Sequence, residues 1–382
     1  FYGLRPSDVA KLPSIRRKFH MSTPEQLQKA LESVIDPNTG KDFVSTKALK
    51  NLVVDGGNVA FDVELGYPAK SQIPALRNAL IAAAKQVPGV VNVSANVTMK
   101  IVAHSAQRGV ALLPQVKNIV AVASGKGGVG KSTTAVNLAL ALAAEGASVG
   151  LLDADIYGPS QPMMMGIEGR PESEDGKTME PMENYGVQVM SIGFLVNQDE
   201  AMIWRGPMAT QALEQLLRQT NWKDLDYLII DMPPGTGDIQ LTLSQRVPMT
   251  GAVIVTTPQD IALLDAKKGI KMFEKVGVPI LGIVENMAVH VCTQCGPVEH
   301  IFGADGGKKM AENYQMDYLG ALPLNMQIRL QADNGKPTVV ADPDGEVAGI
   351  YKSVARQVAI KIAAKAKDFS AKFPTITVSK NT

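Results

Sequence analysis

The stretch SGKGGVGKST, residues 124–133, decides the fold of this 382-residue chain. It follows the apolar run IVAVA, which is typical of a buried strand, and leads into TTAVNLALALAAEG, which is typical of a helix. A glycine-rich loop with the spacing GxxxxGK[ST] between a strand and a helix surrounds a phosphate with backbone N–H groups, and the helix N-terminus lies behind them. We therefore predict a phosphate-binding loop, or P-loop, that begins at Gly125.

Individual residues of this loop have separate predicted roles. The Lys131 ammonium is expected to reach the β- and γ-phosphates of a nucleotide, and the Ser132 hydroxyl is expected to bind Mg2+. A second lysine, Lys126, is not needed to build the turn and adds another cation at the same anion. The predicted nucleotide-binding residues of the loop are Gly125, Lys126, Gly127, Gly128, Val129, Gly130, Lys131, Ser132 and Thr133.

Beyond Lys117 the chain alternates short apolar runs with amphipathic stretches. The runs IVAVAS, SVGLLDAD, DYLIIDMPP, GAVIVTTP and PILGIVENM are typical of fully buried parallel strands. This alternation predicts an α/β fold with a doubly wound, mostly parallel sheet, whose ligands bind at the carboxyl ends of the strands. We assign residues 117–368 to this P-loop domain and residues 369–382 to a tail.

Residues 21–103 have the pattern of a separate small α+β domain. Helices are expected over residues 26–34 and 74–85, and residues 59–65 and 91–97 show the alternation of half-buried strands. Residues 104–116 have neither period and are predicted to form a linker. Residues 1–20 lack an initiator methionine and are expected to be upstream or non-native sequence. An organelle transit peptide is the alternative, because of Arg16, Arg17 and Lys18.

Composition narrows the classes of function. The length favours two domains, and 45% hydrophobic with 20% charged residues is typical of a soluble globular protein. The net charge of +1 predicts no nucleic-acid clamp, and the chain has no apolar run of about 18 residues that would span a membrane. Two cysteines argue against a disulfide scaffold and for a reducing, cytoplasmic compartment.

Acidic residues follow two of the predicted strands. Asp153 and Asp155 follow one strand and Asp231 ends another, so all three are expected beside the P-loop. Carboxylates at this place hold Mg2+ or orient an attacking water. We predict a Mg2+ site of Ser132, Asp153 and Asp231; the alternatives are loop structuring for Asp153 and helix capping for Asp231. The sequence offers no Ser/His/Asp or Cys/His nucleophile around the loop and no evident arginine finger, which predicts a slow ATPase that acts as a switch.

The two cysteines, Cys292 and Cys295, lie three positions apart in VCTQCG, which indicates a shared function. A dithiol redox switch needs no other residue, and a structural zinc site would add His290 and His300. Packing of two small side chains is the simplest alternative. A further possibility is that two protomers each donate both thiolates to one [4Fe–4S] cluster, which takes four of them and would lie on the two-fold axis of a homodimer.

The loop SGKGGVGKST resembles that of the deviant Walker A ATPases, the group of MinD, ParA and the nitrogenase iron protein. The resemblance implies that Lys126 reaches nucleotide phosphate across a dimer interface. It also implies that Lys126, Lys131 and Asp155 are the catalytic residues. Asn286 in IVENM and the loop that begins at Pro323 would hold the adenine.

The region from Lys117 to about Tyr351 resembles the Mrp/ApbC group of P-loop iron–sulfur cluster carriers. The resemblance lies in SGKGGVGKST, DADIYGPS, WRGPM, IIDMPPGTGD and ENMxxxxCxxCGxxxxIFGxxGG. It implies a homodimeric ATPase that uses ATP and Mg2+, holds a [4Fe–4S] cluster at Cys292 and Cys295, and passes it from donors or scaffolds to apoprotein clients. Residues 21–103 resemble the small iron–sulfur assembly domain often fused to these carriers. The stretch GYPAKSQ lacks the cysteine that many such domains carry, so client or scaffold contacts are expected of this domain.

Two rival functions remain open at this point. A positioning ATPase of the MinD or ParA kind would use a C-terminal amphipathic anchor, and Val347, Tyr351, Val354 and Val358 form an apolar stripe at helical spacing. The alternative for this stripe is a last helix packed on the sheet. The second rival is a nucleotide-switched adaptor with a structural zinc site.

Overall fold

The computed structural model describes residues 23–104, 110–196, 206–291 and 296–370, with side chains as far as residue 365. The predicted upstream segment 1–20, most of the tail and both cysteines lie outside the described residues. The chain forms two compact units, which we describe separately. The smaller unit comprises the residues before 65 together with 73–98, and the larger unit comprises residues 65–72 together with those from 99 onward.

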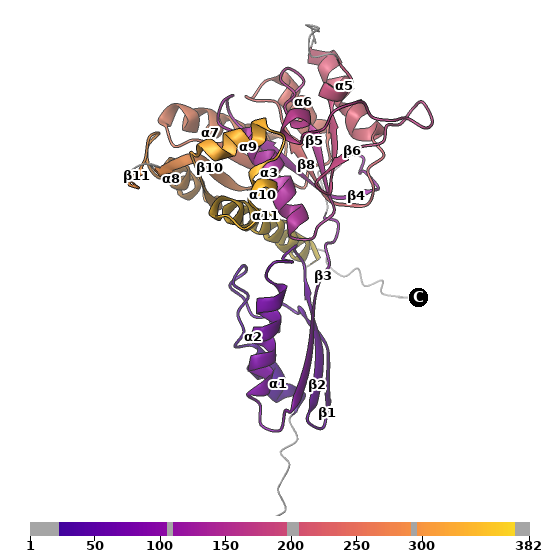
Figure 1. Ribbon diagram of the computed structural model, residues 1–382, viewed down its shortest axis with the longest axis vertical. Helices are drawn as coiled ribbons and strands as arrows, with labels where there is room; N and C mark the ends of the chain where they lie inside the picture. The colour runs from indigo at the N-terminus through magenta and orange to yellow at the C-terminus, as the bar shows by residue number, and fades with distance from the viewer. Residues whose placement is uncertain (1–22, 105–109, 197–205, 292–295, 371–382) are drawn as a thin grey trace, which may run out of the picture. The chain divides into compact units, whose positions relative to one another are not determined.

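The smaller unit combines a three-stranded sheet, ordered β1-β2-β3, with two helices (Figure 1). Thr23 and Gln26 form a reciprocal capping box that begins the first helix. The alternation predicted for residues 59–65 places Val59, Phe61 and Val63 in the core. The elements are α1 (Pro24–Leu31), β1 (Leu49–Asp55), β2 (Asn58–Leu65), α2 (Ile73–Lys85) and β3 (Asn92–Met99).

The larger unit is built on a sheet that has nine strands within the described residues. Their order is β11-β10-β9-β4-β8-β5-β7-β6, and β12 pairs with β10. Among these strands the pairs β10–β11 and β6–β7 are antiparallel and the others are parallel. The predicted α/β fold with a mostly parallel sheet is confirmed. The strands are β4 (Val116–Ala123), β5 (Val149–Asp153), β6 (Met182–Asn184), β7 (Val187–Ser191), β8 (Leu225–Asp231), β9 (Gly251–Thr256), β10 (Ile280–Val291), β11 (Val298–Glu299) and β12 (Tyr318–Pro323).

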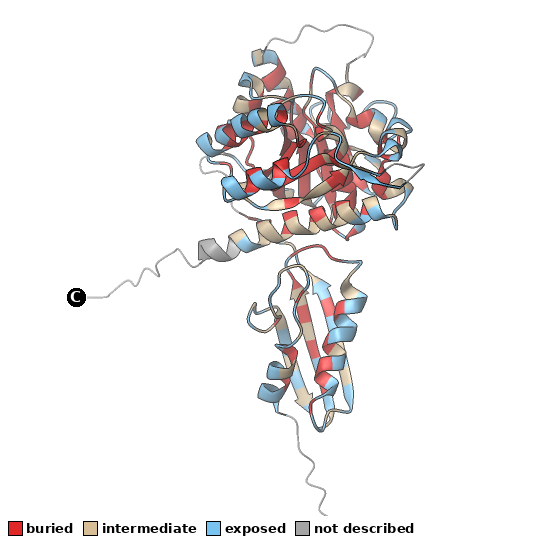
Figure 2. Cartoon of the chain, turned by 90° about the vertical axis from the view of Figure 1, so that its left-hand side faces the viewer, coloured by how far each residue is buried: buried red, intermediate tan, exposed pale blue. Residues whose placement is uncertain are grey.

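Helices cover the sheet, and its central strands are buried along almost their whole length (Figure 2). The first helix after the P-loop packs with the last two helices of the chain, while α5 packs with α6 and α7 with α8. The helices are α3 (Lys131–Ala144), α4 (Gln161–Met164), α5 (Gly206–Gln219), α6 (Asp238–Arg246), α7 (Asp260–Lys275), α8 (Gly306–Asn313), α9 (Met326–Asp333), α10 (Thr338–Ala341) and α11 (Glu346–Ser370), with a 3-10 turn, η1 (Ile192–Phe194).

Three of the four residues of the C-terminal apolar stripe belong to the core, and the fourth, Val347, is half-buried. Tyr351, Val354 and Val358 on α11 are at most 2% exposed, and α11 contacts α3 and β12. The apolar face that a membrane anchor would need is therefore already used in packing, which favours the packed-helix alternative. In the part of the chain that the structure describes, no helix combines the length and the apolar character that crossing a bilayer requires.

Residues 65–72 pack within the larger unit, at the end of α3. The Glu145 carboxylate is fully buried and accepts hydrogen bonds from the backbone N–H and the hydroxyl of Ser71, at 3.0 and 2.7 Å. It also forms an ion pair with Arg356 of α11 at 2.5 Å. A buried carboxylate is costly unless it is satisfied in this way. The segment is thus fixed to the helix that begins at the P-loop.

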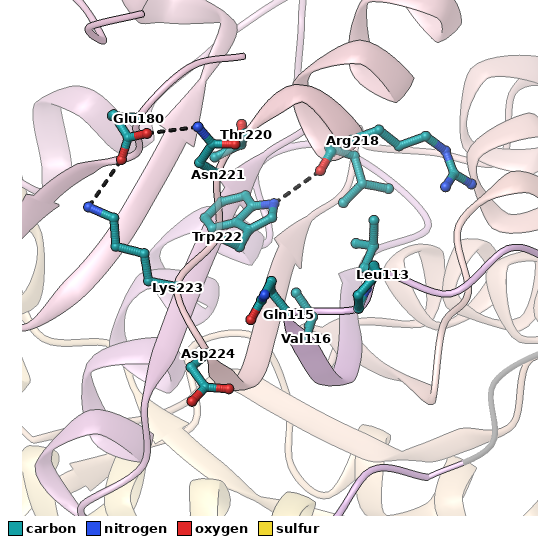
Figure 3. A pocket seen from close by; sticks show the side chains of 12 residues that line it. Leu113, Gln115, Val116, Glu180, Arg218, Thr220, Asn221, Trp222, Lys223 and Asp224 are labelled. Carbon is teal, nitrogen blue, oxygen red and sulfur yellow. Dashed lines mark hydrogen bonds and ion pairs between the residues drawn. The ribbon is translucent and has the colours of Figure 1, made fainter. Parts of the chain in front are cut away.

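A pocket of about 610 Å³ opens at the amino ends of β4 and β8 (Figure 3). Glu180 accepts a hydrogen bond from Asn221 and pairs with Lys223, and Trp222 donates its indole N–H to the Leu217 carbonyl. Through these contacts, polar side chains that line the pocket bond to one another or to the protein backbone. The P-loop lies at the other edge of the sheet, where the strands end.

Candidate nucleotide-binding site

The P-loop joins the carboxyl end of β4 to α3. Gly128 and Gly130 have φ values of 80° and 82°, in the left-handed region that favours glycine. A Cβ added at Gly125 would come within 2.1 Å of the Asp265 backbone in α7, whereas one at Gly127 would meet nothing within 4 Å. The loop therefore needs glycine for two reasons, close approach to α7 and backbone conformation.

The Lys131 ammonium is the centre of the site. Lys131 is only 6% exposed, and its ammonium donates to Asp231 at 2.5 Å and to the Ser132 hydroxyl at 3.1 Å. It also lies 3.9 Å from Asp155. Asp231 ends β8 and is fully buried, so its charge needs a cation nearby. A phosphate bound at the loop would therefore compete with Asp231 for the ammonium.

Asp153 lies beside Asp231, in register with it across the β5–β8 pair. The Asp153 carboxylate is fully buried and accepts four hydrogen bonds at 3.0–3.1 Å. Its donors are the backbone N–H groups of Asp155, Ser160 and Gln161 and the Ser191 hydroxyl. Burial and the negative charge of Asp231 nevertheless raise the pKa of Asp153 to about 7. Burial also raises the pKa of Asp155, against the effect of Lys131.

Gln161, the first residue of α4, is a site residue that sequence analysis missed. Its fully buried side-chain amide donates to the Asp231 carboxylate at 2.8 Å and to the Ser132 carbonyl at 3.1 Å. The segment after β5 is thereby joined to both β8 and the P-loop. The sequence gives no signal for it, because a glutamine in GPSQPM carries no chemistry of its own and its partners are distant along the chain.

The donor set fits Mg2+ bound together with a nucleotide. No group of three or more His, Cys, Asp or Glu side chains in the described ranges is arranged to hold a metal ion. Mg2+ at nucleotide sites is held by one or two carboxylates, phosphates and water, so a complete protein cage is not needed. The three predicted Mg2+ residues, Ser132, Asp153 and Asp231, all supply oxygen. Ser132 and Asp231 accept hydrogen bonds from Lys131, and Asp153 is in register with Asp231.

The residues predicted to hold the adenine lie on two adjacent strands. Asn286 in β10 is 8% exposed, and its amide donates to the Val129 carbonyl in the P-loop at 2.9 Å. Pro323 ends β12, opposite Val289 of β10. Lys126 is half-buried, and its carbonyl accepts a hydrogen bond from the neighbouring Ser124 hydroxyl. The structure thus brings Asn286 to the P-loop, with Pro323 on the neighbouring strand.

The cysteine pair follows β10 directly. Cys292 and Cys295 lie outside the described residues, between Val291 and Gly296. On either side of them β10 and β11 pair antiparallel. The strand that contacts the P-loop through Asn286 therefore continues to the residue before the first thiol.

The two histidines of the zinc alternative are held by different parts of the backbone. The Nδ1 atom of His290 lies 3.1 Å from the Leu324 carbonyl, and that of His300 lies 3.0 Å from the Ala288 carbonyl. His290 is opposite Glu299 in the ladder, and side chains alternate between the faces of a strand. His300 lies just after the end of β11, so the ladder does not pair it with His290.

Comparison with known families agrees with this site. Residues 115–359 match a family model described as NUBPL iron-transfer P-loop NTPase, and residues 24–95 match one described as iron–sulfur cluster assembly protein. The chain belongs to the NUBPL family of iron-transfer P-loop NTPases. The resemblance to iron–sulfur carriers with an N-terminal assembly-type domain is thereby confirmed.

Relatives in this family match most of the chain. An iron–sulfur cluster carrier protein from Pseudomonas fragi is 61% identical over 275 residues, 72% of this chain and 96% of that protein. One from Haemophilus influenzae is 49% identical over 338 residues, 88% of this chain and 91% of that protein. Among solved structures, a nucleotide-binding protein from Archaeoglobus fulgidus in complex with ADP is 37% identical, covers 61% of this chain and 90% of that one, and has a TM-score of 0.53. The chain is thus an NTPase, and a MinD-like positioning function is not favoured.

Gly125→Ala should destabilise the larger unit, because the new Cβ would overlap the backbone of α7. Gly127→Ala is the matched control, since it adds the same atom in the same loop to open space. Overpacking costs about 1–3 kcal/mol or more, so urea unfolding of the nucleotide-free protein should separate the two variants. Equal stability of Gly125→Ala and the wild type would contradict the close contact between the P-loop and α7.

Asp153 should make the nucleotide-free protein less stable as the pH rises. Its pKa is raised from 3.8 to about 7, so in this interval the folded state keeps a proton that the unfolded state has lost. The free energy of unfolding should therefore fall by up to about 1.4 kcal/mol per pH unit between about pH 5 and 7, as urea unfolding would measure. Asp153→Asn has no proton to titrate and should flatten the slope; an unchanged slope would assign it to another group.

Proposed function

We propose that this chain is an iron–sulfur cluster carrier that binds ATP, hydrolyses it slowly and transfers a [4Fe–4S] cluster to apoproteins. The observation that carries the proposal is the path of β10. This strand holds Asn286 against the P-loop and ends at Val291, directly before Cys292. One strand thus connects the nucleotide site with the thiols. The names of the relatives, iron–sulfur cluster carrier proteins, support the same cargo.

ATP is proposed to bind with Mg2+ at the P-loop and to drive loading or transfer of the cluster. The Lys131 ammonium is proposed to turn from Asp231 toward the β- and γ-phosphates, which carry more negative charge. Ser132, Asp153 and Asp231 would then hold Mg2+, which neutralises phosphate charge when bound. Asp155 is proposed to orient the attacking water. Hydrolysis is proposed to be slow, because it serves as a switch.

Two protomers are proposed to share one cluster. A [4Fe–4S] cluster takes four thiolates, and each chain has only Cys292 and Cys295. A two-fold axis brings the same residues of both protomers together, which completes the ligand set. Lys126 is proposed to contact the nucleotide of the partner protomer, so that ATP and the cluster stabilise the same homodimer.

The remaining partners are proposed to be proteins. Residues 24–95 match the iron–sulfur assembly family, but the stretch GYPAKSQ, residues 66–72, contains no cysteine, so contact with cluster donors, scaffolds or clients is the proposed role of this region. Free thiols used for cluster binding require a reducing compartment, and the cytoplasm is the proposed location. With a net charge of +1, no nucleic-acid partner is proposed, and no membrane partner either, because the apolar stripe of α11 is buried.

Anaerobic reconstitution with iron and sulfide tests the cluster. The full chain should take up about four irons per dimer, with a native mass of two chains. Cys292→Ala should lose the cluster, because each protomer then supplies a single thiolate. His300→Ala is the control, since the proposal gives this histidine no part in binding iron.

The same measurement identifies the zinc alternative. One zinc per protomer that resists replacement by iron, and that is lost in His300→Ala, would contradict the cluster. The protein would then be a nucleotide-switched adaptor with a structural metal site.

Lys126→Ala should bind nucleotide but fail to dimerise with it. Lys131 and the backbone N–H groups of the loop remain, so the loss falls on the contact proposed across the interface. Sedimentation velocity with a non-hydrolysable ATP analogue measures this. Lys29→Ala, which removes an exposed lysine of α1, controls for the change in net charge. A Lys126→Ala dimer as stable as that of the wild type would show that the lysine acts within its own protomer.

A further inference from the structure

Gln161 bonds to all three residues of the predicted Mg2+ site. Its backbone N–H donates to the Asp153 carboxylate at 3.0 Å. Its side-chain amide donates to the Asp231 carboxylate at 2.8 Å and to the Ser132 carbonyl at 3.1 Å. Asp153 ends β5, Asp231 ends β8, and Ser132 is the second residue of α3. One residue therefore connects the three elements that would surround the ion.

The hydrogen-bond partners of the Gln161 amide fix its orientation. Both partners of Nε2 are acceptors, a carboxylate oxygen and a backbone carbonyl, so the two Nε2 hydrogens must face them. The amide oxygen, Oε1, faces away from both acceptors. In the part of the chain that the structure describes, this fully buried atom has no hydrogen-bond partner. The other polar groups of Gln161 are paired, since its backbone carbonyl accepts from Met165 at 2.9 Å. A buried acceptor is normally satisfied by a donor, so Oε1 is suited to accept from a bound group.

Asp231 is held at each of its two oxygens by a donor of different charge. The Lys131 ammonium donates to Oδ1, and the neutral Gln161 amide donates to Oδ2. Under the proposed function the ammonium turns toward the phosphates, which frees Oδ1 as a ligand for a cation. The amide carries no charge that the phosphates would attract, so its bond to Oδ2 remains. Gln161 thus keeps the orientation of the Asp231 carboxylate after Lys131 has turned.

We propose that Gln161 is a positioning residue for the Mg2+ that binds with the nucleotide. Its two N–H groups hold the carboxylates of Asp153 and Asp231, and Oε1 accepts a hydrogen bond from a water of the hydrated ion, because Mg2+ in proteins usually keeps several waters. Residues that orient the ligands of a metal typically contribute 10–100-fold to its affinity. The inference rests on the proposed function for the presence of Mg2+, and it needs neither the cluster nor the homodimer.

The effect of Mg2+ on nucleotide affinity measures this role. Isothermal titration calorimetry gives the dissociation constant of ADP for the full chain with saturating Mg2+ and with excess EDTA, and the ratio of the two constants is the Mg2+ effect. ADP is the probe because it excludes hydrolysis and the proposed ATP-dependent dimerisation from the measurement. In the wild type, Mg2+ should strengthen the binding of ADP.

Gln161→Met removes the amide and fills nearly the same space. Lys131 and the P-loop remain, so the affinity for ADP in EDTA should stay close to that of the wild type, whereas the Mg2+ effect should fall about 10-fold or more. A wild-type Mg2+ effect in a Gln161→Met protein that binds ADP would overturn the proposal, since the glutamine would then serve only the stability of the fold.

Gln188→Met is the matched control. Gln188 is the second residue of β7, and its amide bonds to the backbone N–H and carbonyl of Lys223 at 2.9 and 3.1 Å. The control loses the same chemical group and two hydrogen bonds, away from the P-loop edge of the sheet. It should unfold at lower urea concentration than the wild type and keep the wild-type Mg2+ effect. A Mg2+ effect that falls equally in both variants would assign the loss to general destabilisation and would overturn the proposal.

Two further outcomes are separated by the same measurement. If Gln161→Met does not fold, Gln161→Asn takes its place: its amide is one methylene shorter and cannot reach both acceptors, so the same loss is expected, and a wild-type Mg2+ effect would overturn the proposal. A wild type that binds ADP equally well with Mg2+ and with EDTA overturns the proposed Mg2+ site and the role of Gln161 together. Failure of the iron and sulfide reconstitution overturns the proposed cargo alone, because the Mg2+ effect is measured without a cluster.

Discussion

The buried ammonium of Lys131 compensates carboxylates that the fold necessarily gathers. Asp153 and Asp231 end β5 and β8, and neighbouring parallel strands deliver their carboxyl ends to the same edge of the sheet. Two buried carboxylates at adjacent positions repel each other and lose hydration, which the raised pKa of Asp153 reflects. The lysine thus contributes to the stability of the nucleotide-free protein. Under the proposed function, a nucleotide that drew the ammonium from Asp231 would bring Mg2+ as the compensating cation.

The sheet of the larger unit could be predicted because the sequence of a strand buried on both faces is a continuous apolar run. The five predicted runs correspond to β4, β5, β8, β9 and β10. The strands β6 and β11 were not predicted because they span only three and two residues, and β7 and β12 were not predicted because their sequences interrupt the apolar run with polar residues or glycine. In the smaller unit β1 was missed for a related reason: its register with β2 shifts between Lys50 and Val53, so no regular alternation survives.

Within the site, residues with a chemistry of their own could be located from the sequence, and residues that act through partners could not. The lysines and glycines of one short loop, together with aspartates at strand ends, predict a phosphate site. Gln161 gains its importance from Asp231, which lies 70 positions away. The cysteine pair is intermediate: two thiols indicate a metal or a disulfide, and counting ligands in the sequence does not choose between zinc and an iron–sulfur cluster.

The bonds between Ser71 and Glu145 mean that the boundary between sequence families is not a boundary of folding. The family match that ends at residue 95 contains residues 65–72, yet these residues belong to the larger unit, where Ser71 donates to the buried Glu145 carboxylate. A chain trimmed to begin after residue 103 would keep Arg356 but lose both Ser71 donors, and Glu145 would remain buried with part of its hydrogen bonding unmet. The larger unit therefore includes eight residues of the N-terminal family match, and without them Glu145 would lose both of its Ser71 donors.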